Sequence, residues 1–300
     1  MYKVLGLLTG IIIAVMVAVN GGLTRWYGVY TAAVIIHVVG ILFASALMGV
    51  TKKKFRIPKG LPPWLFSGGL IGVFTTVFNN FSFGKISMTG IVALGLLGQA
   101  VTSMLIDGLG LFGMRKYPFR KSSLIGLAFS AAGILVMLDH SAKAAFYAVF
   151  LSFGAGVTIV LSRTVNAGLS EHTGHLQGSL INHMAGLPAA LLFLAVSGRG
   201  EMLFVSPSLP TQYWIYLGGT MGVVTVLLCN ITVPRVPALQ LTMLTFVGQV
   251  FTGIAIDLVS KEGYTRETFM GGLLVAAGMG ANLLWEWGKK CDGKTLKTIR

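Results

Sequence analysis

Residues 98–107 read Gly98-Gln-Ala-Val-Thr-Ser-Met-Leu-Ile-Asp107, an apolar helical segment that carries one glutamine and one aspartate. The pattern returns at Gly248-Gln249 and Ile256-Asp257, with the same eight-residue spacing between glutamine and aspartate. A constant offset of 150 residues separates the two copies. Because polar side chains are costly in an apolar helix, their repetition indicates that the chain is a duplication.

The composition is that of a membrane protein. Of 300 residues, 54% are hydrophobic and 11% charged, and the mean hydropathy is +0.80, far from the average soluble domain. A helix needs about 20 apolar residues to cross about 30 Å of hydrocarbon. The sequence therefore predicts an all-α membrane protein with ten transmembrane helices: Val4–Val19, Val29–Val50, Trp64–Phe83, Met88–Gly108, Leu124–Leu138, Ala145–Val165, Leu176–Val196, Trp214–Ile231, Ala238–Val259 and Phe269–Trp287.

The first span and the cysteines have ordinary explanations. Lys3 followed by an apolar run is typical of a signal peptide, but further spans follow, so we expect an uncleaved first helix. Cys229 falls inside the eighth predicted span and Cys291 in the polar tail, which does not indicate a disulfide framework.

Lysine and arginine are unevenly distributed between the two ends of the spans. If successive loops alternate between sides, one side holds 17 cations and the other 6. The larger group includes the cluster 52–59, Arg163 and the tail 289–300. Cytoplasmic loops retain positive charge, so both termini are predicted to be cytoplasmic. The net charge of +14 is thus explained by topology, with anionic headgroups as neighbours, and we expect no nucleic-acid partner.

The duplication extends over most of the chain. Asn20-Gly21-Gly22 matches Asn166-Ala167-Gly168 at an offset of 146. His37 with Gly40 matches His183 with Gly186 at the same offset. At an offset of 150, the matching sets are Trp64, Gly68, Gly69, Gly72 and Asn80 in the first half, and Trp214, Gly218, Gly219, Gly222 and Asn230 in the second.

Each half holds five predicted spans, and an odd number forces the second copy to enter the membrane upside down. This is the inverted-repeat organisation of secondary transporters. We therefore predict a first five-helix repeat over residues 1–141, a second, inverted repeat over 142–288, and a basic cytoplasmic tail over 289–300. Matched residues near span centres, such as Gln99 with Gln249 and His37 with His183, are expected at the same depth.

The Gly-Gln…Ile-Asp helix, the Asn-Gly helix end and the Trp64-x3-Gly68-Gly69-x2-Gly72 helix together resemble the drug/metabolite transporter superfamily. The most similar branch is that of YdcZ-like inner-membrane exporters, whose five-helix unit occurs singly or fused in tandem. The resemblance implies a ten-helix bundle in the bacterial inner membrane, a central cavity, alternating access, and export of small metabolites or drugs.

In this superfamily the first, third and fourth helices of each half line the cavity. The resemblance therefore implies that substrate is bound by Asn20, Asn80 and Gln99 with their partners Asn166, Asn230 and Gln249. One departure concerns coupling. The small multidrug-exporting relatives carry a glutamate in the first helix, and this chain has no acidic residue there, so their coupling mechanism does not transfer directly.

The glutamines must face protein or water, because an unpaired amide in hydrocarbon is expensive. Gln99 and Gln249 either bind substrate or lock helices together; bonds of the second kind are worth only about 0.6 kcal/mol, which favours substrate binding. Gln99, Ser103 and Asp107 follow one another at four-residue intervals. One helix face therefore carries a polar stripe from the midplane toward the surface.

Four titratable side chains are candidates for ion coupling. His37 and His183 titrate near neutral pH and could carry a proton; alternatively, each is a neutral imidazole bonded to a backbone carbonyl. Asp107 and Asp257 lie near span ends. They either take part in coupling or cap helix ends and pair with loop cations such as Arg115.

Enzyme activity, a cofactor and a metal site are not expected. Residues 288–295 fit the phosphate-loop pattern, but no strand precedes them and no nucleotide-binding domain follows. The sequence thus favours a secondary exporter of a small organic molecule, with inward proton flow as a candidate driving force. The alternative is a lipid-handling, scramblase-like or non-transporting membrane protein. With no lysine or arginine assigned to midplane depth, we expect a neutral, zwitterionic or cationic substrate. The oligomeric state is left open, a homodimer included.

Overall fold

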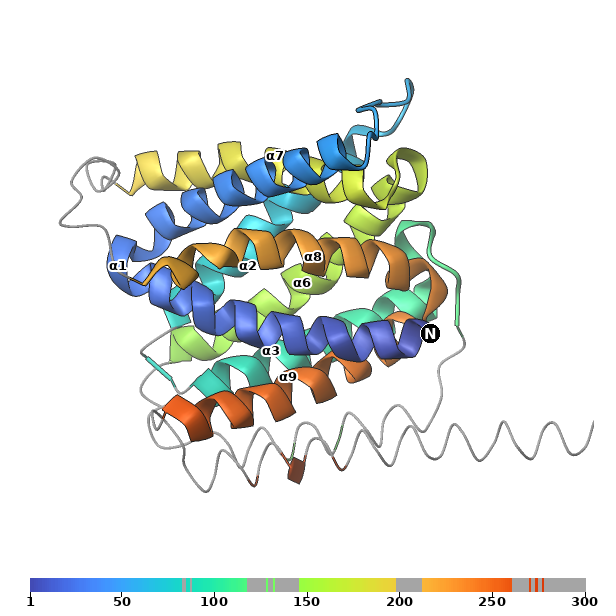
Figure 1. The fold of residues 1–300 in the computed structure, drawn as a ribbon. Coiled ribbons are helices and arrows are strands. Elements are labelled where there is room, and N and C mark those ends of the chain that lie inside the picture. Colours follow the sequence, from blue (N-terminus) through green and yellow to red (C-terminus); the bar gives the residue numbers. More distant parts are fainter. Residues whose placement is uncertain are drawn as a thin grey trace, which may run out of the picture.

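The structure, a computed structural model, describes residues 1–82, 85–86, 88–117, 146–197 and 212–260, with isolated positions at 128, 132, 270, 273–274 and 277. These residues form a bundle of helices (Figure 1). The predicted class, an all-α membrane protein, is confirmed for this part of the chain. The predicted spans 124–138 and 269–287 and the tail 289–300 fall essentially outside the described residues, as do the side chains of Asn80 and Asp257.

The helices are α1 (Tyr2–Val50), α2 (Gly68–Ser82), α3 (Met88–Leu109), α6 (Phe146–Thr173), α7 (His175–Val196), α8 (Gly218–Thr232) and α9 (Ala238–Ser260). Short 3-10 turns flank them: η1 (Pro63–Ser67), η2 (Leu111–Gly113), η4 (Tyr213–Leu217) and η5 (Val233–Arg235). Five helical segments in the described residues are long and apolar enough to cross a membrane: Tyr2–Val50, Phe146–Thr173, His175–Val196, Tyr213–Arg235 and Ala238–Ile256.

Helix α1 consists of two arms. As one straight helix its 49 residues would measure about 74 Å, more than twice the hydrocarbon thickness. At Gly28 the backbone leaves the helix with φ 75° and ψ 170°, a conformation that glycine adopts without a steric penalty. The chain turns back there, and Figure 1 shows the second arm returning along the bundle toward α7. The arms correspond to the first two predicted spans.

Two predicted helix ends were wrong. The first span was expected to end at Val19, but the helix continues to the bend at Gly28, since packing against η4 and α8 compensates for the poor helix formers Asn20, Gly21 and Gly22. The span expected over Ala145–Val165 is α6, which runs to Thr173. Arg163, assigned above to a cytoplasmic end, therefore lies well inside a helix and is only 7% exposed.

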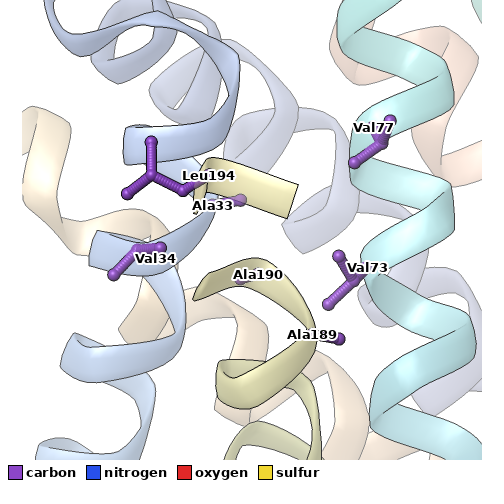
Figure 2. Close-up of a cluster of buried hydrophobic side chains, with 7 residues drawn as sticks. All are labelled: Ala33, Val34, Val73, Val77, Ala189, Ala190 and Leu194. Atoms are coloured by element: carbon purple, nitrogen blue, oxygen red, sulfur yellow. The ribbon is translucent and has the colours of Figure 1, made fainter. Parts of the chain in front are cut away.

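Small apolar residues bring the helices together. Figure 2 shows Ala33 and Val34 of α1, Val73 and Val77 of α2, and Ala189, Ala190 and Leu194 of α7 in one buried cluster. Membrane helices associate through such close packing, because lipid tails are as apolar as leucine.

Large apolar side chains, in contrast, remain on the outside of the bundle. Leu42 is 65% exposed, Leu192 64% and Phe251 56%. An apolar exterior of this kind is typical of a lipid-facing surface.

Helices α3 and α9 pack side by side in opposite directions. Leu96 of α3 packs with Met243 and Phe246 of α9. Toward the C-terminal end of α3, the Ser103 hydroxyl hydrogen-bonds the Thr242 hydroxyl at 2.8 Å. This interface joins the two chain segments that carry the duplicated Gly-Gln motif.

Candidate functional site

Two histidines meet in the interior of the bundle. The rings of His37 on α1 and His183 on α7 lie edge to face with centroids 5.3 Å apart, and both residues are buried, at 6% and 3% exposure. A methyl group at Gly40 would collide with the His183 ring, and one at Gly186 would collide with the His37 ring. Each histidine thus occupies the space left by the glycine three residues after the other.

Three nitrogens of this pair have no hydrogen-bond partner. They are Nδ1 of His37 and both Nδ1 and Nε2 of His183. The alternative considered above, an imidazole bonded to a backbone carbonyl, is therefore not seen at these three atoms. Buried polar atoms are nearly always paired in proteins, and exceptions occur where a proton, water or ion is handled.

Contacts between the two halves occur in matched pairs, so that each contact has a counterpart made by the corresponding residues of the other repeat. The Asn20 side chain lies against Gly218, and the Asn166 side chain against Gly68. The same exchange holds for three glycine pairs and the backbone that each touches: Gly219 lies against Ile36 and Gly69 against Asn182, Gly248 against Leu7 and Gly98 against Phe153, Gly10 against Thr245 and Gly156 against Gly95. These contacts leave no room for a side chain, which explains why glycine recurs at the matched positions.

The two glutamines lie beside these close helix crossings. Gln99 of α3 is 4% exposed and its backbone nitrogen lies next to Gly156 of α6. Gln249 is half-buried in α9, directly after Gly248, which touches α1. Both glutamines thus lie on helices next to close helix crossings, and an amide in hydrocarbon requires such protein surroundings.

The predicted polar stripe on α3 faces protein. One helical turn after Gln99, Ser103 contacts α9 through Thr242. Asp107 accepts hydrogen bonds from the backbone N–H groups of Ala238 and Leu239, each at 2.9 Å. The Asp107 carboxylate thereby caps the N-terminus of α9, where unpaired N–H groups favour a negative charge. Of the readings left open for Asp107, the helix cap is the one observed, but on another helix rather than its own.

Arg163 is the functional candidate that sequence reasoning missed. Its Nη2 donates to the hydroxyl of Ser103 at 3.1 Å, to the carbonyl of Ala238 at 3.3 Å and to the Thr242 hydroxyl. Its Nε is buried without a partner. A signal was present, since an arginine eight residues after Ala155 and three before Asn166 lies within an unbroken apolar helix pattern. The charge count instead placed it at the cytoplasmic end of its predicted span.

The asparagines link helices. Asn166 Nδ2 donates to Asn182 Oδ1 at 2.7 Å, and Asn230 Nδ2 donates to the carbonyl of His175 at 3.0 Å. The side-chain oxygens of Asn20 and Asn230 are buried without partners, so each retains one free acceptor.

One comparison with known proteins identifies a family. The family model described as "Putative inner membrane exporter, YdcZ" matches residues 1–136 and again 147–281, so the two halves each resemble one family unit. A search of curated proteins found no match.

The fold is shared with solved structures. Among 22 matching chains, one described as "Crystal structure of protein" superimposes with a TM-score of 0.63, covering 95% of this chain and 96% of its own length. Its sequence identity is 13%, so this likeness concerns the fold alone.

Proposed function

This chain belongs to the YdcZ family of drug/metabolite transporters, and from that premise we propose that it is a secondary exporter working by alternating access. It is a multi-pass protein of the inner membrane, and its partners are the lipid bilayer and a small-molecule substrate. The solute is organic, and both chain termini face the cytoplasm, in keeping with the charge asymmetry of the loops.

The reciprocal contacts around the histidine pair carry this proposal. A pseudo-two-fold axis between two repeats requires that residue and partner exchange roles, as Asn20 with Gly218 and Asn166 with Gly68 do. The proposed architecture is ten helices in two inverted five-helix repeats. Two such repeats can rock against each other and expose a shared midplane site to either side in turn.

The paired glutamines are the proposed substrate ligands. Gln99 and Gln249 are matched amides on antiparallel neighbours, and an amide can both donate to and accept from a polar solute. The free oxygens of Asn20 and Asn230 are further proposed ligands, one near each end of α8. Asn166 has a structural role in this scheme through its bond to Asn182, and Asn80 remains a proposed ligand on sequence grounds alone.

The histidine pair is the proposed proton site. Its three unpartnered nitrogens can take up a proton without breaking an existing bond, and two adjacent imidazoles cannot both be cationic at low cost. One proton per cycle, entering as solute leaves, would supply the driving force. Asp257 completes the set of candidate coupling groups on sequence grounds, while the capping role of Asp107 makes it a helix clamp.

The test compares metabolites in the spent medium of cells expressing the wild type or the Gln99→Ala/Gln249→Ala variant, at matched membrane abundance. The proposal expects a few compounds to accumulate only with the wild type. A Thr51→Ala variant controls for substitution itself, because Thr51 lies exposed at the end of α1 and bonds only its own helix.

Suppose that the wild type changes the metabolites in the medium relative to an empty vector. If the glutamine variant then gives the same metabolites as the wild type, the glutamines are excluded as substrate ligands. Media that never differ from the vector would count against export. A fluorescent-lipid flux assay in reconstituted vesicles then decides whether the protein moves lipid instead.

A further inference from the structure

Two opposite charges hold the first turn of α9. Asp107 of α3 accepts from the N–H groups of Ala238 and Leu239. Arg163 of α6 donates to the Ala238 carbonyl and to Thr242, one turn further along α9. The same guanidinium also bonds Ser103, so it connects three helices at one point. Ile106, Val160 and Ala238 form a buried apolar cluster beside these bonds.

This arrangement is not required by the duplication. The position that matches Arg163 in the first half, at the offset of 146, is Val17. The polar residues singled out from the sequence do have polar matches: Asn20 with Asn166, His37 with His183, and Asp107 with Asp257. Arg163 therefore adds to the second half a buried charge that the matched position of the first half lacks.

The added charge is expensive in this position. An arginine inside a membrane bundle is rare and is retained where it has a function. Its compensation is incomplete, because Nε is buried and unpaired. A purely structural link between α3 and α9 already exists in the Ser103–Thr242 bond, so Arg163 is not needed to hold these two helices together.

We propose that Arg163 is the gate residue at the Asp107 end of the bundle, a positioning residue that closes this end by holding α3, α6 and α9 together. Its release separates the N-terminus of α9 from α6 and opens this end. In a carrier built from two repeats, a clamp present at one end only favours the state closed at that end, predicted to be the cytoplasmic one. The inference rests on the proposed function, since a gate has meaning only in a carrier that alternates.

The chain contains its own reporter for this movement. Cys229 of α8 is a free cysteine, 7% exposed. It packs in one buried cluster with Ala167 of α6 and Leu241 of α9. Separation of α6 from α9 would therefore expose the Cys229 thiol to a water-soluble reagent.

The experiment measures the rate of maleimide labelling of Cys229 in membranes, in a Cys291→Ser background. Arg163→Val gives the position the residue of its repeat partner and is expected to label about tenfold faster, as a shift toward the open state predicts. Arg163→Lys keeps the charge and is expected to fall between the two. Gln177→Ala, at the same end of the bundle but bonded to Arg56 rather than to α9, is the matched control and should not change the rate.

A second probe separates gating from general loosening. Thr24 lies near the bend of α1, at the opposite end of the bundle, and its hydroxyl is buried. In a Thr24→Cys, Cys229→Ser, Cys291→Ser chain, Arg163→Val should leave the labelling rate unchanged. Faster labelling at both ends would indicate a damaged fold and overturn the proposal, as would an unchanged rate at Cys229. The labelling assay needs no substrate. Faster labelling of Cys229 together with an unchanged medium would count against export of a solute while still supporting an alternating movement controlled by Arg163.

Discussion

The imidazoles of His37 and His183 contact each other edge to face, and each covers the glycine that follows the other histidine by three residues. His-x-x-Gly is thus a reciprocal fit between α1 and α7. The glycines supply the space and the histidines fill it, so neither residue type can change without affecting the other half of the molecule.

Gly40→Ala should destabilise the protein. The added methyl group meets the His183 ring, and overpacking of a tight core typically costs about 1–3 kcal/mol. The measurement is the thermal unfolding midpoint of purified protein in detergent. Gly49→Ala on the same helix is the control, because no atom lies within 4 Å of its added carbon. Equal midpoints for the two variants would contradict the observed packing.

Replacement of either histidine by glutamine should uncouple export from the proton gradient. Glutamine keeps a polar side chain of similar length but does not titrate. For compounds found in the spent-medium comparison, we expect a protonophore to reduce wild-type export several-fold and to have little effect on residual export by His37→Gln or His183→Gln. His175→Gln, at the start of the same helix α7, should remain protonophore-sensitive. If the His37 and His183 variants retained full sensitivity, the pair would not be the proton site.

Asp107→Ala should loosen the start of α9. The carboxylate satisfies two backbone N–H groups, and loss of an N-terminal cap typically costs about 0.5–2 kcal/mol. The measurement is amide hydrogen exchange of a peptide containing Ala238 and Leu239, which we expect to become faster.

Asp107→Asn keeps one acceptor oxygen and should show a smaller change in exchange. A peptide from α7 serves as the internal reference in both variants. Unchanged exchange at the start of α9 in Asp107→Ala would mean that other groups satisfy these amides.

Gln177→Ala should release the basic loop between α1 and η1. The Gln177 amide accepts from the Arg56 N–H at 3.1 Å and donates to the Arg56 carbonyl at 2.6 Å, which fixes the loop backbone at two points. Limited trypsin digestion of open membranes should cut at the lysines and arginine of 52–59 several-fold faster in the variant. Ser170→Ala, at the same end of the bundle, is the control. Equal cleavage rates would show that the loop is held by other contacts.

Several features follow from the sequence without a structure. Insertion in a membrane depends on local apolar length, which any window of about 20 residues reveals. The duplication can be recognised from the sequence because Gln99, Asp107, His37 and Asn20 each have an identical residue in the second half at an offset of 146 or 150. The glycines indicated close helix contacts, since only a small residue allows backbones to approach.

The identity of those contacts required the tertiary structure. Gly40 could have met any helix; that it meets His183 depends on how segments 146 residues apart fold together. Helix ends were misjudged for the same reason, as α1 continues past Asn20 because Gly218 packs against that side chain.

Arg163 shows most clearly what could not be predicted from the sequence. Its charge was counted at the cytoplasmic end of its predicted span, and the apolar segment around it gave no sign of its partners. Ser103, Thr242 and Ala238 come from distant parts of the chain. Only when the fold brings them together do their hydrogen bonds offset the cost of burying the Arg163 guanidinium. Composition and periodicity are properties of neighbouring residues, so the sequence by itself determined that the chain lies in a membrane and that it contains a duplication. The pairing of polar groups that are distant along the chain depends on tertiary structure. Only the fold therefore decided which residues form the site.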